Sequence, residues 1–371
     1  MTALGRLRFP IGRSLGRRYP ELPHPYRNEF QRDRDRIIHS HSFRRLENKT
    51  QVFPAGISDH FRTRLTHTME VSQVARTVAS ALELDEDLTE ALSLGHDIGH
   101  PPFAHAGEEE LDRQMRRFGE GFDHNLHALR IVESFEHRYA RFPGLNLTFE
   151  VREGIAKHSH DFERGENPAL DEYLPGLRPP LEAQLIDMAD EVAYNTADLD
   201  DGLESRLLSL EQIRAGLLVF EKFYLEAEKA YPGAPEKLKF NEALREVYDR
   251  LAGDLIRNTQ QRLQEEKIHS VDNVRAFPQR LAGFSPQVDA ERRQIKEFLQ
   301  VNVYQNAQLD SGKKDAEKII RQLFEFWMEN PEKLPRSYQQ KDEPLPRVIC
   351  DYIAGMTDNF IYEQYEKYCQ Q

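Results

Sequence analysis

This chain of 371 residues has only two cysteines, one tryptophan and no long apolar run. Neither Cys350 nor Cys369 has a neighbour that completes a metal-binding motif, so we predict reduced thiols without a disulfide framework. No stretch approaches the ~18 consecutive apolar residues that a transmembrane helix needs. The first residues also lack the apolar core of a signal peptide. We therefore expect a cytoplasmic protein with no membrane partner.

Two common catalytic motifs are also missing, the glycine-rich loop of P-loop enzymes and the serine elbow of serine hydrolases. Alternation of the strand type is sparse, whereas apolar residues recur at helical spacing between Pro/Gly-rich breaks. We predict an all-α fold. We expect a basic N-terminal arm packed on the core over residues 1–40, a helical catalytic core over residues 41–210 and a C-terminal helical region over residues 211–371.

The charge is unevenly distributed along the chain. The net charge is −13, yet the first 50 residues hold twelve Lys and Arg against five Asp and Glu. An acidic body disfavours non-specific binding to DNA. The basic segment is a candidate for binding the phosphates of a substrate, a regulatory nucleotide or single-stranded nucleic acid. The alternative is a solubilising arm.

Histidines gather in the segment Gly95–His105, which holds three of the 14 in the chain. Side chains of neighbouring residues on a helix diverge by about 100°, so the adjacent His96 and Asp97 converge on one point only where a helix ends. Gly95 and Pro101 are helix breakers that supply such an end. An imidazole beside a carboxylate suits a divalent metal such as Mn, Fe, Mg or Zn.

Two further segments can complete a metal site. His67 belongs to a predicted long helix in which apolar residues repeat from Leu65 to Leu82. A second long helix is predicted over Pro180–Glu204, with one polar row at steps of three or four that comprises Asp187, Asp190, Tyr194, Asp198 and Asp201. Buried carboxylates in such a row need a cation or hydrogen-bond donors. For the carboxylates alone a solvated acidic face is the better interpretation, but Tyr194 and the histidine cluster favour a site.

The order His67, His96-Asp97, Asp190 resembles the H…HD…D signature of the HD-domain metal-dependent phosphohydrolases. Within them the chain resembles the deoxyguanosinetriphosphate triphosphohydrolase family, and the resemblance extends from residue 32 to residue 358. The matching segments are Arg32–Ser40, Phe43–Leu46, Lys49–Phe53, Gly95–His105, Gly107–Glu108, Phe122–Asn125, Ala189–Glu191 and Asp351–Asp358. The resemblance implies an HD-domain helical core with an additional C-terminal helical region.

The resemblance also implies a reaction, in which a dNTP and water give a deoxynucleoside and inorganic triphosphate. The implied metal ligands are His67, His96, Asp97 and Asp190, with Mg²⁺ or Mn²⁺ as cofactor and Fe, Co, Ni or Zn as alternatives. A divalent cation lowers the pKa of bound water towards neutrality. Arg64 lies three residues before His67, on the same helical face, and can contact a phosphate at the metal. Lys157 is a weaker candidate for a phosphate contact, and a solvated lysine is the alternative.

Three further histidines, His100, His105 and His124, stand at positions that line the phosphates in the resembling family. His105 and Glu108 are three residues apart, so the carboxylate can orient the imidazole as in a general acid–base pair. The resemblance implies that His105 protonates the departing 5′ oxygen, while roles as a base or a nucleophile stay open. For any one of these histidines alone, a structural hydrogen bond is the alternative.

The sugar contacts and partners follow from the same resemblance. Gln51 and Asp198 are expected to bind the 3′-hydroxyl, and Tyr194 to pack on C2′ and leave no room for a ribose hydroxyl. The resemblance implies a homo-oligomer such as a hexamer, with an allosteric nucleotide or single-stranded DNA open as a further partner. Two alternative functions stay open. The first is an HD phosphohydrolase for another nucleotide such as a 5′-monophosphate, and the second is a nucleotide- or nucleic-acid-binding regulator with weak activity. The intact ligand set argues against the regulator.

Overall fold

The fold is entirely helical across residues 4–52 and 60–370, which the computed structural model describes. These residues form helices α1–α17 and no extended strand, although isolated bridges join Arg17 to Thr148 and Thr50 to Thr63. The all-α prediction is therefore confirmed. Within these residues no helix is long and apolar enough to cross a membrane. Cys350 and Cys369 are both free thiols.

The chain divides into two compact units, and each combines segments that are distant in sequence. The first unit comprises Met1–Ser14, Met69–Ser93 and His158–Ala307, and the second comprises Leu15–Thr68, Leu94–Lys157 and Gln308–Gln371. The division into three parts at residues 40 and 210 stays a prediction.

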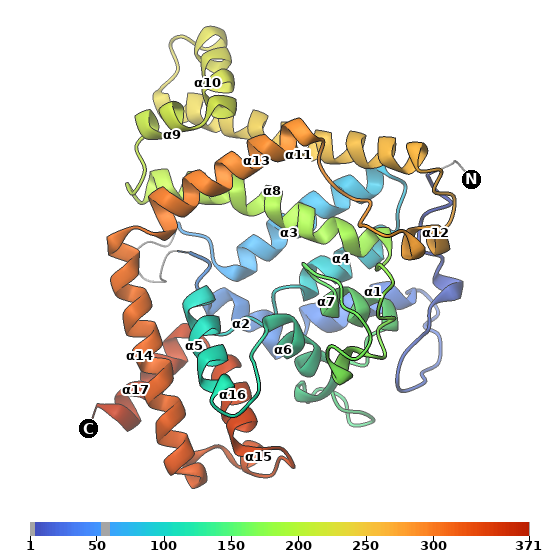
Figure 1. Cartoon of the computed structure of the whole chain (residues 1–371), viewed down its shortest axis with the longest axis vertical. Helices are drawn as coiled ribbons and strands as arrows, with labels where there is room; N and C mark the ends of the chain where they lie inside the picture. The colour runs from blue at the N-terminus through green and yellow to red at the C-terminus, as the bar shows by residue number, and fades with distance from the viewer. Residues whose placement is uncertain (1–3, 53–59, 371) are drawn as a thin grey trace. The chain divides into compact units, whose positions relative to one another are not determined.

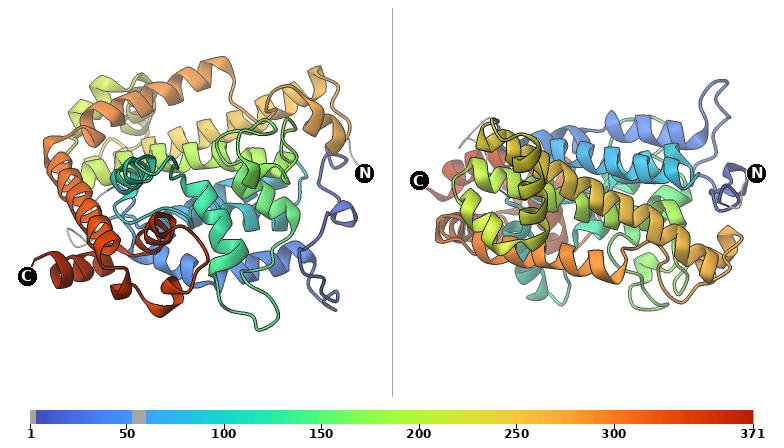
Figure 2. Two further views of the ribbon diagram at one scale, coloured as in Figure 1. Left: turned by 60° about the horizontal axis from the view of Figure 1, so that its bottom comes forward. Right: turned by 90° about the horizontal axis from the view of Figure 1, so that it is seen from above.

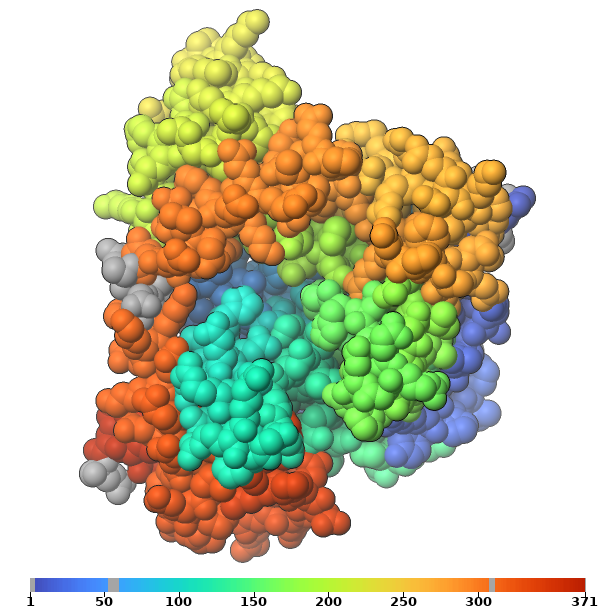
Figure 3. All heavy atoms as spheres, in the orientation of Figure 1, coloured from blue at the N-terminus to red at the C-terminus, as the bar shows by residue number. Residues whose placement is uncertain are grey.

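The first unit is built on the long helix α8, which packs beside α11 and α13 (Figures 1 and 2). The buried stripe of α8 includes Leu185, Val192 and Leu199, as its apolar periodicity predicted. Helix α10 packs on α11 and stands out from α8 and α13 (Figure 3). The helices lying wholly or largely in this unit are α3 (Arg64–Ala81), α4 (Glu86–Gly95), α8 (Leu181–Glu204), α9 (Leu210–Gly216), α10 (Leu218–Ala230), α11 (Glu236–Glu265), α12 (Val271–Ala276) and α13 (Pro286–Leu299).

The second unit surrounds an apolar cluster that includes the fully buried Trp327. Helices α5, α14, α16 and α17 all contribute to this cluster (Figure 1). The helices of the unit are α1 (Glu29–Ile38), α2 (His41–Arg45), α5 (Ala104–Arg116), α6 (His124–Arg130), α7 (Phe149–Ala156), α14 (Ala307–Glu329), α15 (Arg336–Gln339), α16 (Leu345–Ala354) and α17 (Asp358–Cys369).

Many arginines of the basic N-terminal segment form ion pairs inside their own unit. In the second unit Arg17 pairs with Glu29 at 2.7 Å and with the buried Asp33. In the first unit Arg8 pairs with Asp85 at 2.8 Å. Further pairs of this kind are Arg13–Asp272, Arg32–Glu29 and Arg36–Glu21. Much of the positive charge in this segment is therefore already paired with carboxylates of the same unit, and a role in phosphate binding stays a prediction.

Candidate active site and metal centre

The histidine-rich segment lies where α4 ends. The helix stops at Gly95 and a turn follows over residues 96–99, so His96 and Asp97 occupy the helix end that the sequence predicted. A Cβ atom on Gly99 would lie 2.0 Å from the carbonyl oxygen of His124. The turn packs directly against the start of α6, which carries His124, and this close approach leaves room only for glycine at position 99.

A cluster of metal-type donors is buried in the second unit. His67 stands in the first turn of α3, and its ring lies 6.0 Å from that of His96, with nitrogen atoms within 4.8 Å of each other. Asp97 Oδ1 lies 3.7 Å from His96 Nε2. All three residues are almost completely buried. Two imidazoles and a carboxylate are donors for a divalent cation, so this cluster fits a metal.

Arg64 controls the charge of Asp97. Its Nη1 donates to Asp97 Oδ2 at 2.9 Å, and both side chains are buried. Burial alone would raise the pKa of the Asp97 carboxyl, but Arg64, followed by the nearby His100 and His96, holds that pKa well below its ordinary value. Asp97 is therefore ionised, which is the form that a metal ligand requires.

A second group of donors lies in the same unit and comprises His100, Glu108 and His124. Glu108 Oε1 lies 2.7 Å from His124 Nδ1 and also accepts the backbone N–H of His124 at 3.1 Å. The rings of His100 and His124 stack with centroids 4.0 Å apart. Burial raises the pKa of Glu108, but the neighbouring His105 and His124 outweigh burial and lower it strongly. Together with the nearby His105, the group presents an ionised carboxylate among three imidazoles.

The position of His105 differs from that of the other histidines. Its side chain is 81% exposed, and its Nδ1 lies 3.8 Å from Glu108 Oε2. Helical spacing paired Glu108 with His105, whereas its shortest imidazole contact is with His124, 16 residues further along the chain. The exposure leaves His105 accessible to a ligand, and its role as an acid, base or nucleophile stays a prediction.

Tyr194 is held by a charged network in the first unit. Its hydroxyl donates to Glu191 Oε2 at 2.7 Å. The same carboxylate accepts from Arg292 at 2.5 Å and from Lys296 at 3.0 Å, and both basic residues belong to α13. Burial and the charge of Glu191 raise the pKa of Tyr194, so the phenol stays neutral and keeps the proton that it donates to Glu191. Sequence reasoning missed both basic residues, because no motif marks them.

Two carboxylates of the polar row on α8 accept hydrogen bonds within the first unit, as carboxylates removed from water require. Asp187 contacts His158 Nδ1 at 2.7 Å and accepts the backbone N–H of Ser159 at 2.9 Å. Asp198 is buried and accepts the hydroxyl of Tyr304. Asp190 lies on α8 as the helical periodicity placed it, and its role as a metal ligand stays a prediction.

The remaining two candidates have different surroundings in the second unit. Lys157 is buried and donates to Glu153 at 3.0 Å, which excludes the solvated lysine that was the alternative. Gln51 is half-buried, and within the described residues its buried Oε1 accepts no hydrogen bond. Phe53, the last residue of the matching segment that contains Gln51, lies outside the described residues.

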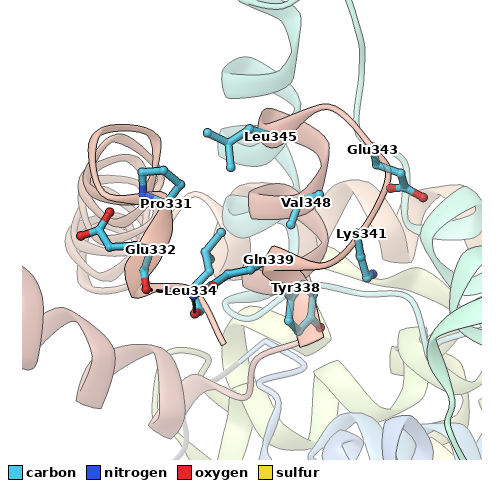
Figure 4. Close-up of a pocket in the computed structure, with 9 residues that line it drawn as sticks. All are labelled: Pro331, Glu332, Leu334, Tyr338, Gln339, Lys341, Glu343, Leu345 and Val348. Carbon is cyan, nitrogen blue, oxygen red and sulfur yellow. Dashed lines mark hydrogen bonds between the residues drawn. The ribbon is translucent and has the colours of Figure 1, made fainter. Parts of the chain in front are cut away.

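A cavity of about 290 Å³ opens elsewhere in the second unit, between the end of α14 and α16 (Figure 4). Its lining residues are Pro331, Glu332, Leu334, Tyr338, Gln339, Lys341, Glu343, Leu345 and Val348. The candidate residues named above are absent from this lining, so the cavity is separate from the histidine cluster.

Two known domain families match this chain. The HD domain profile matches residues 64–195, a range that includes His67, His96, Asp97 and Asp190. A phosphohydrolase-associated domain profile matches residues 282–367, from just before α13 to α17. The helical fold and the two matches define the class as that of the HD-domain phosphohydrolases.

Curated relatives define the family more narrowly. A protein of Geobacter sulfurreducens is 44% identical over 357 residues, covering 96% of this chain and 92% of the relative. Proteins of Bordetella pertussis and Ralstonia nicotianae are 45% and 46% identical, covering 99% and 95% of this chain and 96% and 91% of the relatives. All three are called deoxyguanosinetriphosphate triphosphohydrolase-like proteins. The chain belongs to this family.

Proposed function

We propose that this protein is a metal-dependent triphosphohydrolase that converts a dNTP, dGTP foremost, and water into a deoxynucleoside and inorganic triphosphate. The observation that carries the proposal is a buried cluster in which His67 and Arg64, from the start of α3, meet His96 and Asp97, which directly follow α4. The names of the relatives support dGTP as the substrate to test first.

The proposed ligands are His67, His96, Asp97 and Asp190. The first three rest on the geometry of the second unit, whereas Asp190 rests on the order of the family motif. When bound, a divalent cation supplies a water molecule of lowered pKa as the nucleophile. Mg²⁺ or Mn²⁺ is the proposed ion, with Fe, Co, Ni or Zn as alternatives. The ion pair with Arg64 keeps Asp97 ionised before any cation binds.

Hydrolysis at the α-phosphorus needs a proton for the leaving group. The water oxygen bonds to the α-phosphorus, the bond from phosphorus to O5′ breaks, and O5′ takes a proton to become the 5′-hydroxyl. We propose that the accessible His105 delivers this proton and that Glu108 orients it. Arg64, His100 and His124 are the proposed contacts of the phosphate oxygens.

The proposed sugar pocket discriminates deoxyribose from ribose. Tyr194 has its hydroxyl fixed by Glu191, so its ring cannot easily turn away from a 2′-hydroxyl. Gln51 and Asp198 are the proposed partners of the 3′-hydroxyl. Lys157 remains a weaker proposed phosphate contact, because its ammonium group already bonds Glu153. A clash of the ring with a 2′-hydroxyl, together with the burial of that hydroxyl without a hydrogen-bond partner, would disfavour ribose.

The test combines substrate range with isotope labelling. The purified protein is incubated in H₂¹⁸O with each dNTP or NTP and with Mn²⁺ or Mg²⁺. The products are separated by ion-exchange chromatography, and their masses are measured by mass spectrometry. We expect deoxynucleoside and intact triphosphate, with ¹⁸O in the triphosphate alone. Pyrophosphate with dNMP, phosphate with dNDP, or label in the nucleoside would contradict the proposed bond cleavage. Phosphate release from 5′-monophosphates alone would favour the alternative phosphohydrolase.

We further propose that the protein is a cytoplasmic homo-oligomer, such as a hexamer, whose activity responds to an allosteric nucleotide or to single-stranded DNA. Light scattering with and without nucleotide measures the assembly. Activity on one dNTP with a second dNTP or an oligonucleotide added measures the regulation. A monomer whose rate is unchanged by either addition would contradict this proposal.

A further inference from the structure

The turn at residues 354–358, from the end of α16 to the start of α17, binds two backbone segments of the second unit that precede candidate site residues. Asp358, the first residue of α17, is 4% exposed. Its Oδ1 accepts the backbone N–H of Phe103 at 3.1 Å, and its Oδ2 accepts that of Thr50 at 2.8 Å. Phe103 lies two residues before His105, and Thr50 directly precedes Gln51. One buried carboxylate therefore joins segments that are 255 and 308 residues away in sequence.

The same turn makes further bonds to the chain around these segments. The Lys49 ammonium group donates to the carbonyl oxygen of Ala354 at 3.1 Å and also to that of His100. Arg45 donates to the carbonyl oxygen of Gly355 at 2.9 Å. Lys49 thus connects the end of α16 to the histidine-rich turn. The contacts at Asp358 belong to a network rather than to a single isolated bond.

The backbone before His105 adopts a conformation that needs support. Phe103 and Ala104 have φ of 65° and 53°, so two consecutive residues with side chains occupy the left-handed region. Such residues are costly there, and they persist where surrounding contacts hold them. Phe103 provides no side-chain cap for α5. The bond from its N–H to Asp358 and the packing of its ring on Tyr362 at 5.2 Å are contacts that hold it.

We propose that Asp358 is a positioning residue, which sets where His105 and Gln51 stand by holding the backbone of Phe103 and Thr50. The proposal rests on the proposed function, because it gives His105 a role at the reacting phosphate. The carboxylate suits this task since it offers one acceptor oxygen to each N–H. In asparagine an amide NH₂ group, which only donates, replaces one of these oxygens, so one of the two N–H groups loses its acceptor.

The first experiment compares Asp358→Asn with Thr357→Ala, both purified with metal. Thr357 caps α17 by accepting the N–H of Phe360 at 3.3 Å, so its loss weakens the same helix without touching Phe103 or Thr50. We expect Asp358→Asn to keep its bound metal and lose roughly 10- to 100-fold in kcat, the scale of a displacement of about 1 Å. Thr357→Ala should lower Tm and keep the kcat of the wild type.

A rescue experiment separates positioning from general stability. Glycine enters the left-handed region without the cost that alanine meets. Introduced into the wild-type protein, Ala104→Gly should therefore leave kcat unchanged. Introduced into Asp358→Asn, it should restore part of the kcat that this variant has lost. A kcat of Asp358→Asn within twofold of wild type would overturn the proposal. Equal losses of kcat in Asp358→Asn and Thr357→Ala would do the same, as would the absence of rescue.

Hydrogen exchange of the wild-type protein tests whether Asp358 holds the backbone amides of Phe103 and Thr50, without any variant and without any substrate. Peptides covering Thr50 and Phe103 should show amide protection that outlasts that of the exposed loop around Tyr26, which is 90% exposed. Rapid exchange of both amides in the folded protein would overturn the proposal, even if Asp358→Asn fails to fold. A protein that hydrolyses no nucleotide but protects both amides would refute the proposed function, whereas the hold of Asp358 on the two segments would still be supported.

Discussion

Replacing Glu182 by glutamine should stabilise the protein at pH 8 and have much less effect at pH 5. Glu182 stands in the first turn of α8 and is completely buried in the first unit. Its Oε1 accepts the backbone N–H groups of Phe9 at 2.8 Å and of Asp85 at 3.1 Å. Burial raises the pKa of this carboxyl from 4.5 to about 7, and these two hydrogen bonds only partly oppose the rise.

The sign of the effect follows from where the proton is held more tightly. The folded state has the higher pKa, so the stability contributed by protonated Glu182 is complete below the unfolded value of 4.5 and is lost as the pH rises through about 7. Each pKa unit corresponds to about 1.4 kcal/mol. Between pH 5 and pH 8 this group alone should lower the free energy of unfolding by roughly 2–3 kcal/mol.

Glutamine keeps the shape of the side chain and an acceptor oxygen for both N–H groups, and it carries no charge. Urea titrations at pH 5 and pH 8 should show the variant gaining roughly 2–3 kcal/mol relative to wild type as the pH rises. Glu226→Gln, at an exposed position on α10, provides the matched control and should show no such change. A Glu182→Gln effect of the same size at both pH values would refute the reasoning.

Three further predictions concern the proposed site. His96→Ala should lose bound divalent metal, measured by elemental analysis, and abolish turnover with near wild-type circular dichroism; full activity would remove the metal assignment. His105→Ala should keep metal and nucleotide binding but lose roughly 10²–10⁴-fold in kcat at saturating dGTP; a rate near that of wild type would exclude it as the proton donor. Wild type should cleave dGTP far faster than GTP, and Tyr194→Ala should narrow this gap; equal kcat/KM for the two nucleotides in wild type would contradict the proposed pocket.

Much of the local structure around the site could be predicted because its causes lie close together in sequence. Gly95 ends α4, and the periodic apolar residues that follow Pro180 give α8 the predicted bounds to within one residue. The helical position of His67 followed from the same kind of periodicity. These features depend on helix-breaking residues and on the 3.6-residue repeat, which act over a few residues at a time.

The partners of the charged side chains could not be predicted in this way. Glu108 has its shortest imidazole contact with His124 rather than with His105, and Lys157 is buried against Glu153. Helical spacing indicates which side chains can share a face, but several candidates meet that condition at once. The packing of α5 against its neighbours selects among them, and burial then decides whether a charge needs a partner.

The sequence by itself determined the helical class, the helix ends and the ordered residues of the family motif, since each follows from short-range patterns. The tertiary structure alone decided that Asp358 holds Phe103 and Thr50, and that Glu182 is buried where its pKa rises. A carboxylate in the first turn of a helix looks the same in sequence whether it faces water or two distant N–H groups. Long-range packing determines the difference, because desolvation and hydrogen bonding depend on segments that only folding brings together.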